Sequence, residues 1–143
     1  MIAYIDTSAL AKCYIREPRS VEVLDWAEQR QGVVISALAL VDFRCMLARR
    51  RRAREIDSAL ERSALAQFDS HVRNNACRIH QGAFGEYAEA RDLIETLPAL
   101  PLRTLDVLHL AAARSVGAAE FATSDGTQAK AARALGFTVF DFS

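Results

Sequence analysis

The chain has 143 residues, a length that fits one domain of ordinary size. Its 18 acidic and 18 basic residues cancel, so it lacks the overall positive charge of many proteins that bind nucleic acid. Any binding of nucleic acid must therefore depend on a local concentration of charge. Such a concentration occurs between Arg44 and Arg54, where arginines crowd into one short stretch.

The cysteines, Cys13, Cys45 and Cys77, are far apart in the sequence, form no CxxC pair and have apolar neighbours. We expect them to be reduced core residues rather than disulfide or zinc-binding residues. No apolar run approaches the roughly 20 residues that a membrane-spanning helix needs. The apolar run before Asp6 is too short for a secretory signal. The sequence therefore predicts a soluble, cytoplasmic protein.

Short apolar runs alternate with amphipathic segments along the whole chain. The predicted elements of the first half are a strand at 2–5, helices at 9–15 and between Val21 and Gly32, a strand at 33–35, a long helix from Ser36 into the arginines, and a helix at 56–68. Those of the second half are a strand at 77–79, helices at 84–94 and, capped by Thr104, at 105–115, a strand at 120–123, a helix at 127–135 and a strand at 138–140.

Strands that alternate with helices predict an α/β fold with a parallel sheet covered by helices on both faces. We expect one domain over residues 1–143, a three-layer sandwich with about five short strands. Such sheets bind ligands beyond the carboxyl ends of their strands, where the strand order reverses. That edge of the sheet is therefore where we look for chemistry.

Two aspartates follow predicted strands. Asp6 comes directly after the first strand, and Asp125 follows the fourth with one residue between them. Either could be explained locally, Asp6 as a helix cap and Asp125 as a turn residue. Together they place two carboxylates at the same edge of the sheet.

A third aspartate lies inside a predicted helix. Asp42 has Leu38 and Met46 one helical turn away on either side, so its carboxylate points along an apolar face. A buried carboxylate is costly unless it finds a cation. The alternative to a functional role is a salt bridge to an arginine such as Arg49 or Arg103.

The fourth aspartate, Asp106, lies in the first turn of a helix within the apolar segment 105–113. The helix dipole would stabilise a carboxylate there.

If all four acids reach one edge of the sheet, the repulsion between their carboxylates must be offset by positive charge. Mg²⁺ or Mn²⁺ could supply it, because both ions bind carboxylate and water oxygens readily. Metal-dependent nucleases use such a site to activate water and stabilise phosphate charge. Zinc is not expected without His or Cys ligands.

Four segments carry a resemblance that covers essentially the whole chain: 4–12 (YIDTSALAK), 35–42 (ISALALVD), 105–113 (LDVLHLAAA) and 122–125 (ATSD). In order and spacing they resemble the PIN-domain family, in particular the VapC-type toxins of bacterial toxin–antitoxin pairs. The resemblance implies a Mg²⁺- or Mn²⁺-dependent endoribonuclease of the bacterial cytoplasm. It also implies a homodimer, and a cognate antitoxin that folds a segment over the site. Larger assemblies of toxin and antitoxin are compatible with this resemblance.

The resemblance also implies roles for individual residues. The main metal ligands would be Asp6 and Asp106, and the acids that complete the cluster would be Asp42 and Asp125. The hydroxyl groups that support them by hydrogen bonds would be those of Thr7, Ser8 and Thr123. At Asp42 the family usually carries Glu. This departure leaves open a PIN-like module that binds RNA or a partner without cleaving.

Two further features have two interpretations each. The arginines Arg49, Arg50, Arg51 and Arg52 either contact RNA or the antitoxin, or form a solvated helix end that the dipole favours. His109 lies one helical turn after Asp106 and is either a general base or a structural histidine.

The sequence leaves the RNA target open. An aspartyl-phosphate phosphatase is disfavoured, because it would need a second Asp where this chain has Ser8.

Overall fold

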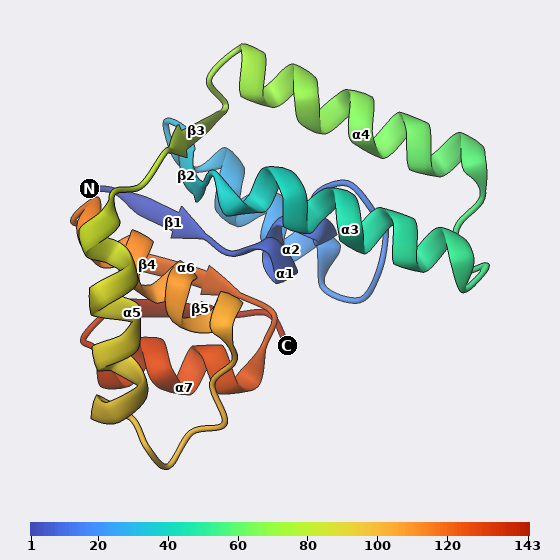
Figure 1. Cartoon of the computed structure of the whole chain (residues 1–143). Helices are drawn as coiled ribbons and strands as arrows, with labels where there is room; N and C mark the ends of the chain where they lie inside the picture. Colours follow the sequence, from blue (N-terminus) through green and yellow to red (C-terminus); the bar gives the residue numbers. More distant parts are fainter.

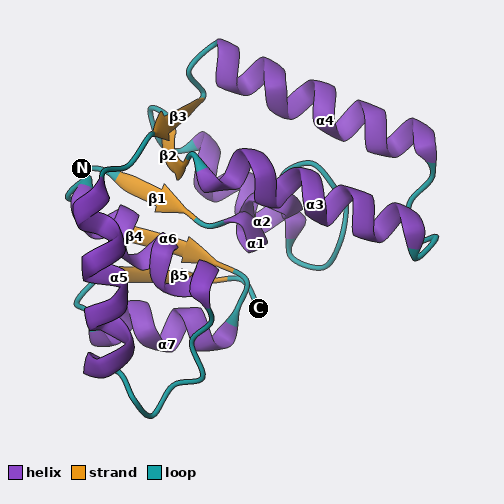
Figure 2. Ribbon diagram, in the orientation of Figure 1, coloured by secondary structure: helices purple, strands orange, loops and turns teal.

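The structure is a computed structural model that describes residues 1–143. Five short strands form one parallel sheet in the order β3-β2-β1-β4-β5 (Figure 2). The strands are β1 (Ala3–Ile5), β2 (Val33–Ser36), β3 (Cys77–His80), β4 (Glu120–Thr123) and β5 (Thr138–Asp141). The predicted parallel sheet of about five short strands is confirmed.

Seven helices connect the strands and cover the sheet. They are α1 (Thr7–Lys12), α2 (Ser20–Glu28), α3 (Leu38–Arg52), α4 (Ser58–Arg73), α5 (Phe84–Thr96), α6 (Thr104–Ser115) and α7 (Gly126–Ala134). Figure 1 shows α3 and α4 running side by side on one side of the sheet, with α5, α6 and α7 on the other. No helix is both long and apolar enough to cross a membrane.

The alternation of side chains along the strands produces two cores. Ile5 and Ile35 face one side of the sheet, where they join a core that includes Phe43 of α3. Tyr4 and Phe121 face the other side and join a core with residues of α5, α6 and α7. The predicted three-layer arrangement is therefore confirmed, since each face of the sheet has its own apolar layer of helices.

Three local predictions were wrong. Helix α4 starts later than predicted, because Asp57 caps it by accepting a 2.8 Å hydrogen bond from the Leu60 amide, and it continues to Arg73. Thr104 is the first residue of α6 rather than its cap. Cys45 is exposed rather than in the core, because its position on α3 faces away from the sheet.

The order of the strands reverses at the centre of the sheet. From β1 the chain builds outward through β2 and β3 on one side, and β4 and β5 follow on the other. The pairing of Ile5 with Ala122 brings the carboxyl ends of β1 and β4 next to each other. This is the position at which parallel α/β sheets bind ligands.

Candidate active site

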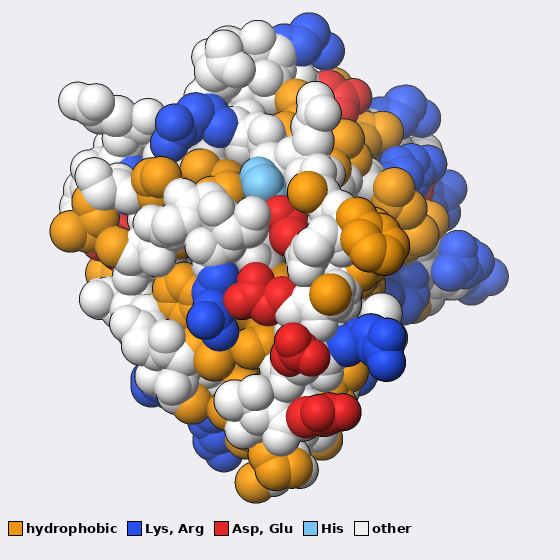
Figure 3. Space-filling model, turned by 60° about the vertical axis from the view of Figure 1, so that its left-hand side comes forward, with side chains coloured by type: hydrophobic (Ala, Val, Ile, Leu, Met, Phe, Trp, Pro, Cys, Tyr) orange, Lys and Arg blue, Asp and Glu red, His pale blue; other side chains and the backbone are white.

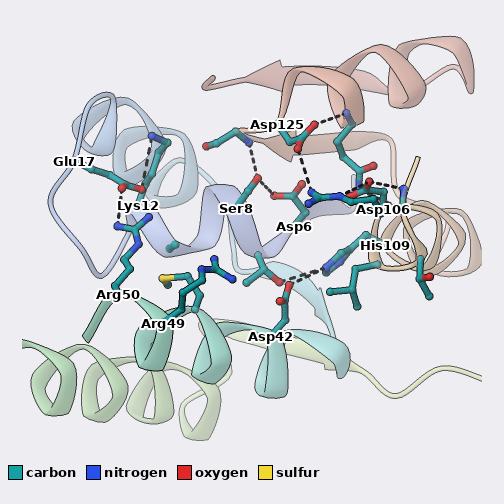
Figure 4. A pocket seen from close by; sticks show the side chains of 18 residues that line it. Asp6, Ser8, Lys12, Glu17, Asp42, Arg49, Arg50, Asp106, His109 and Asp125 are labelled. Atoms are coloured by element: carbon teal, nitrogen blue, oxygen red, sulfur yellow. Dashed lines mark hydrogen bonds and ion pairs between the residues drawn. The ribbon is translucent and has the colours of Figure 1, made fainter. Parts of the chain in front are cut away.

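All four predicted acids line one cavity of about 610 Å³ at the carboxyl edge of the sheet (Figure 4). Asp6 and Asp125 are the N-cap residues of α1 and α7, so each is held where a strand passes into a helix. Asp106 comes from the first turn of α6 and Asp42 from α3. Four separate segments therefore deliver one carboxylate each, as the sequence predicts.

Asp6 lies at the centre of this group and is only 4% exposed. Its Oδ1 accepts hydrogen bonds from the Ser8 hydroxyl at 2.6 Å and from the Ala9 amide at 3.0 Å. Its Oδ2 accepts from the Thr123 hydroxyl at 2.5 Å. Burial still outweighs these bonds and the nearby His109, so the pKa of Asp6 is raised. The ionised carboxylate would be stabilised by a cation in the cavity.

The hydroxyls of Ser8 and Thr123 tie the two central strand ends together. Ser8 Oγ accepts from the Ser124 amide at 2.8 Å, and Thr123 Oγ1 accepts from the Asp125 amide at 3.0 Å. Both hydroxyls also contact Asp6 directly. Two of the three hydroxyls singled out from the sequence therefore lie against a cavity acid at hydrogen-bond distance.

Arg103 lies between Asp106 and Asp125 at the mouth of the cavity. Asp106 Oδ2 accepts a 2.8 Å bond from the Arg103 amide and is 3.4 Å from its Nε, and an outer guanidinium nitrogen is 3.6 Å from Asp125 Oδ2. The Arg103 side chain is 77% exposed, so these ion pairs are at the surface. The suggested salt bridge of Arg103 to Asp42 is therefore wrong. Asp106 follows Arg103 by three residues, which is the spacing of a capping box. The contact between Arg103 and Asp106 could therefore have been predicted from the sequence.

The neighbour of Asp42 is His109, whose Nε2 is 3.9 Å from Asp42 Oδ2. The neighbouring His109, and to a smaller extent Thr7, lower the pKa of Asp42, and the positive charge of Arg49 adds to this effect. Asp42 forms no direct salt bridge to Arg49, so that alternative is also wrong. The structure therefore places a histidine rather than an arginine beside Asp42, and this partner could not be identified from the sequence.

A basic wall faces the acids across the cavity. Lys12, Arg49 and Arg50 line it, whereas Arg51 and Arg52 do not (Figure 4). Glu17 is 2.8 Å from Arg50 and 3.7 Å from Lys12, so it holds these two cations in place. Of the four arginines at positions 49–52, the first two therefore line the cavity and the last two lie outside it. Figure 3 shows acidic side chains gathered near the centre of one face of the molecule, with basic side chains beside them and most densely along the right-hand edge.

The donor atoms of the cavity suit a hard divalent cation. They are carboxylate and hydroxyl oxygens, which Mg²⁺ and Mn²⁺ prefer. No three His, Cys, Asp or Glu side chains converge closely enough to hold one ion together. Mg²⁺ commonly uses only one or two carboxylates and completes its shell with water and substrate phosphate. The open arrangement of these acids fits that mode of binding.

Comparison with known proteins agrees with this geometry. Residues 3–134 match the PIN domain family. Ribonuclease VapC46 of Mycobacterium tuberculosis is 32% identical to the chain over 139 residues, which are 95% of this chain and 94% of that protein.

Solved structures share the fold at low sequence identity. VapC20 of Mycobacterium tuberculosis, described as a sarcin-ricin loop cleaving toxin, has a TM-score of 0.72 at 19% identity and covers 95% of this chain and 96% of its own. VapBC2 of Rickettsia felis, bound to a DNA fragment from its promoter, scores 0.71 at 16% identity and covers 100% of both chains. FitAcB of Neisseria gonorrhoeae scores 0.68 at 18% identity, with 99% and 97% covered. The chain belongs to the PIN-domain family and is similar in sequence and fold to VapC proteins.

Proposed function

We propose that the chain is a Mg²⁺- or Mn²⁺-dependent endoribonuclease, built as one nuclease domain over residues 1–143, that hydrolyses phosphodiester bonds of RNA. The observation that carries the proposal is the cavity in which four carboxylates from four segments face a basic wall. The name of the relative VapC46, a ribonuclease, supports RNA as the substrate. The RNA would be met in the bacterial cytoplasm.

The residues of the cavity divide this work between them. Asp6 and Asp106 would hold the cation, and Asp42 and Asp125 would complete the acidic cluster and orient water. When bound, the cation would supply positive charge for the phosphate and activate the attacking water. Arg49 lies two helical turns after Asp42 on α3, beside it in the cavity, and would bind a phosphate of the RNA backbone (Figure 4).

A cognate antitoxin is the proposed protein partner, which makes the chain the toxin of a type II toxin–antitoxin pair. The fold is shared with VapBC2 and FitAcB. The cavity lies open at the carboxyl edge of the sheet, where a segment of another protein could cover it. In that complex, we expect a basic side chain of the antitoxin to lie among the acids.

A homodimer is the proposed assembly of the toxin itself. Val41 of α3 and Phe84 and Tyr87 of α5 are exposed hydrophobic side chains around a second cavity. An exposed apolar patch of this kind is typical of a protein interface. Light scattering should give twice the 15.8 kDa chain mass, and a monomer at all concentrations would contradict the dimer.

One observation favours a second candidate, a PIN-like module that binds RNA or a partner without cleaving it. Asp42 is one methylene shorter than the usual glutamate of the family. The two candidates differ in what Asp42→Glu should do. If the chain is a nuclease limited by the shorter side chain, this variant should cleave RNA faster than the unaltered chain, whereas a non-cleaving module should remain inactive.

The direct test uses the antitoxin-free chain with total bacterial RNA in EDTA, in Mg²⁺ and in Mn²⁺. The proposal predicts discrete fragments only when a divalent cation is present, and their ends would identify the target. RNA that stays intact with either ion but is still bound would favour the non-cleaving module. Cleavage that persists in EDTA would contradict the proposed use of metal.

A further inference from the structure

His109 occupies a buried position between three elements of the site. It lies on α6, one turn after Asp106, and is 3% exposed. Its Nδ1 is 2.7 Å from the Tyr4 hydroxyl of β1, and its Nε2 is 3.3 Å from the Thr7 hydroxyl of α1. The same Nε2 faces Asp42 of α3 at 3.9 Å. Both ring nitrogens therefore have polar neighbours, and neither points to open solvent.

The chemistry of these neighbours sets the direction of the hydrogen bonds. With the Tyr4 phenol as the donor to Nδ1, the hydrogen of the His109 ring is on Nε2. That N–H points toward the Thr7 hydroxyl and toward the Asp42 carboxylate, which when ionised only accepts.

Tyr4 is itself held in the sheet. It is fully buried on β1, the central strand of the sheet, and its ring stacks on Phe121 of β4 with 5.4 Å between the ring centroids. The 2.7 Å contact between its hydroxyl and Nδ1 therefore fixes the orientation of the His109 ring relative to the sheet.

We propose that His109 is a positioning residue that holds the carboxylate of Asp42 toward the acidic cluster and thereby sets the affinity of the cavity for its divalent cation. The inference rests on the proposed function, because it concerns the same cation. The Asp42 side chain is 27% exposed, so without His109 it could turn away into solvent. Groups that orient metal ligands in this way typically change metal affinity about ten- to a hundredfold.

The test is the Mn²⁺ affinity of the full-length, metal-free chain, measured by calorimetry without RNA. His109→Leu should weaken binding by about ten- to a hundredfold. In an Asp42→Asn background the same substitution should change the affinity less than twofold, because His109 acts through Asp42. A loss of equal size in both backgrounds would overturn the proposal, since independent effects add.

His71 provides a matched control. Its Nδ1 is 2.8 Å from the Tyr14 hydroxyl, so it forms the same kind of tyrosine–histidine bond, but it does not line the cavity. His71→Leu should lower thermal stability and leave Mn²⁺ affinity within twofold of the unaltered chain. His109→Gln keeps an N–H donor near the position of Nε2 and should restore most of the affinity that His109→Leu loses.

Tyr4→Phe tests the same chain of hydrogen bonds should His109→Leu fail to fold. It removes only the hydroxyl and should weaken Mn²⁺ binding severalfold, again only when Asp42 is present. If the unaltered chain binds Mn²⁺ and the variants at His109 and Tyr4 bind it equally well, the positioning role is wrong while the proposed function stands. If the unaltered chain shows no saturable binding, both are overturned.

Discussion

The hydroxyl of Thr123 donates a 2.5 Å hydrogen bond to Oδ2 of Asp6, which links the carboxyl end of β4 to the carboxyl end of β1. Both residues are buried. Short bonds of this kind are typical when the acceptor is charged. Because Thr123 Oγ1 also accepts from the Asp125 amide, one hydroxyl helps to place two of the four acids.

Thr123→Val should therefore affect the site more than the fold. The change keeps the shape of the side chain but leaves Asp6 without one donor, which we expect to cost about 1–3 kcal/mol of unfolding free energy. Mn²⁺ affinity should fall about ten- to a hundredfold. Thr138→Val, at an exposed position on β5, is the control. Equal Mn²⁺ affinity in the two variants would contradict the role of Thr123.

The pH dependence of stability should report the burial of Asp6. Its raised pKa means that the folded, metal-free chain holds a proton there more tightly than the unfolded chain does. The stability contributed by that proton is present at low pH and is lost as the pH rises through the raised pKa. Asp6→Asn removes this loss, so in EDTA its Tm relative to the unaltered chain should rise as the pH increases above about 4, the ordinary pKa of an aspartate.

Comparing the two chains at each pH separates Asp6 from Asp42. The pKa of Asp42 is lowered, so it contributes in the opposite sense and loses stability as the pH falls. This contribution is common to both chains and cancels in the difference. A Tm difference that stays constant with pH would show that Asp6 does not titrate as its burial predicts.

The acids could be placed from sequence because local signals mark them. Asp6 and Asp125 follow strands that end at the same edge, and parallel strands bring such positions together whatever the details of packing. Asp42 and Asp106 stand out as carboxylates in apolar helical segments. The strand order, which brings β1 and β4 together, could not be read from the chain itself.

Contacts between distant segments were harder to predict. Single-sequence patterns give the face on which Asp42 lies but not which side chain packs against that face. The alternative partners suggested from the sequence were therefore arginines, whereas the structure places His109 there. Cys45 also has apolar sequence neighbours yet faces outward. In each case the missing information was tertiary packing, which overrides the local pattern.

The different positions of Arg49 and Arg51 lead to a prediction for RNA binding. Arg49 lines the cavity, whereas Arg51 lies outside it. Arg49→Gln should weaken the binding of single-stranded RNA and reduce the slope of log affinity against log salt by about 0.7, the effect of one lost phosphate contact. Fluorescence anisotropy in an Asp106→Asn background avoids cleavage during the measurement. Arg51→Gln should leave both quantities unchanged, and equal effects of the two variants would argue against a specific contact in the cavity.

The central claim is that the acidic cavity cleaves RNA, and Asp106→Asn tests it most directly. The matched control is Asp69→Asn, which removes an exposed carboxylate of α4 outside the cavity. All three chains would be purified identically and incubated with total bacterial RNA and Mn²⁺. We predict the same discrete fragments from the unaltered chain and from Asp69→Asn, and none above background from Asp106→Asn. Fragments of equal yield from Asp106→Asn would contradict a cleavage mechanism that depends on these acids.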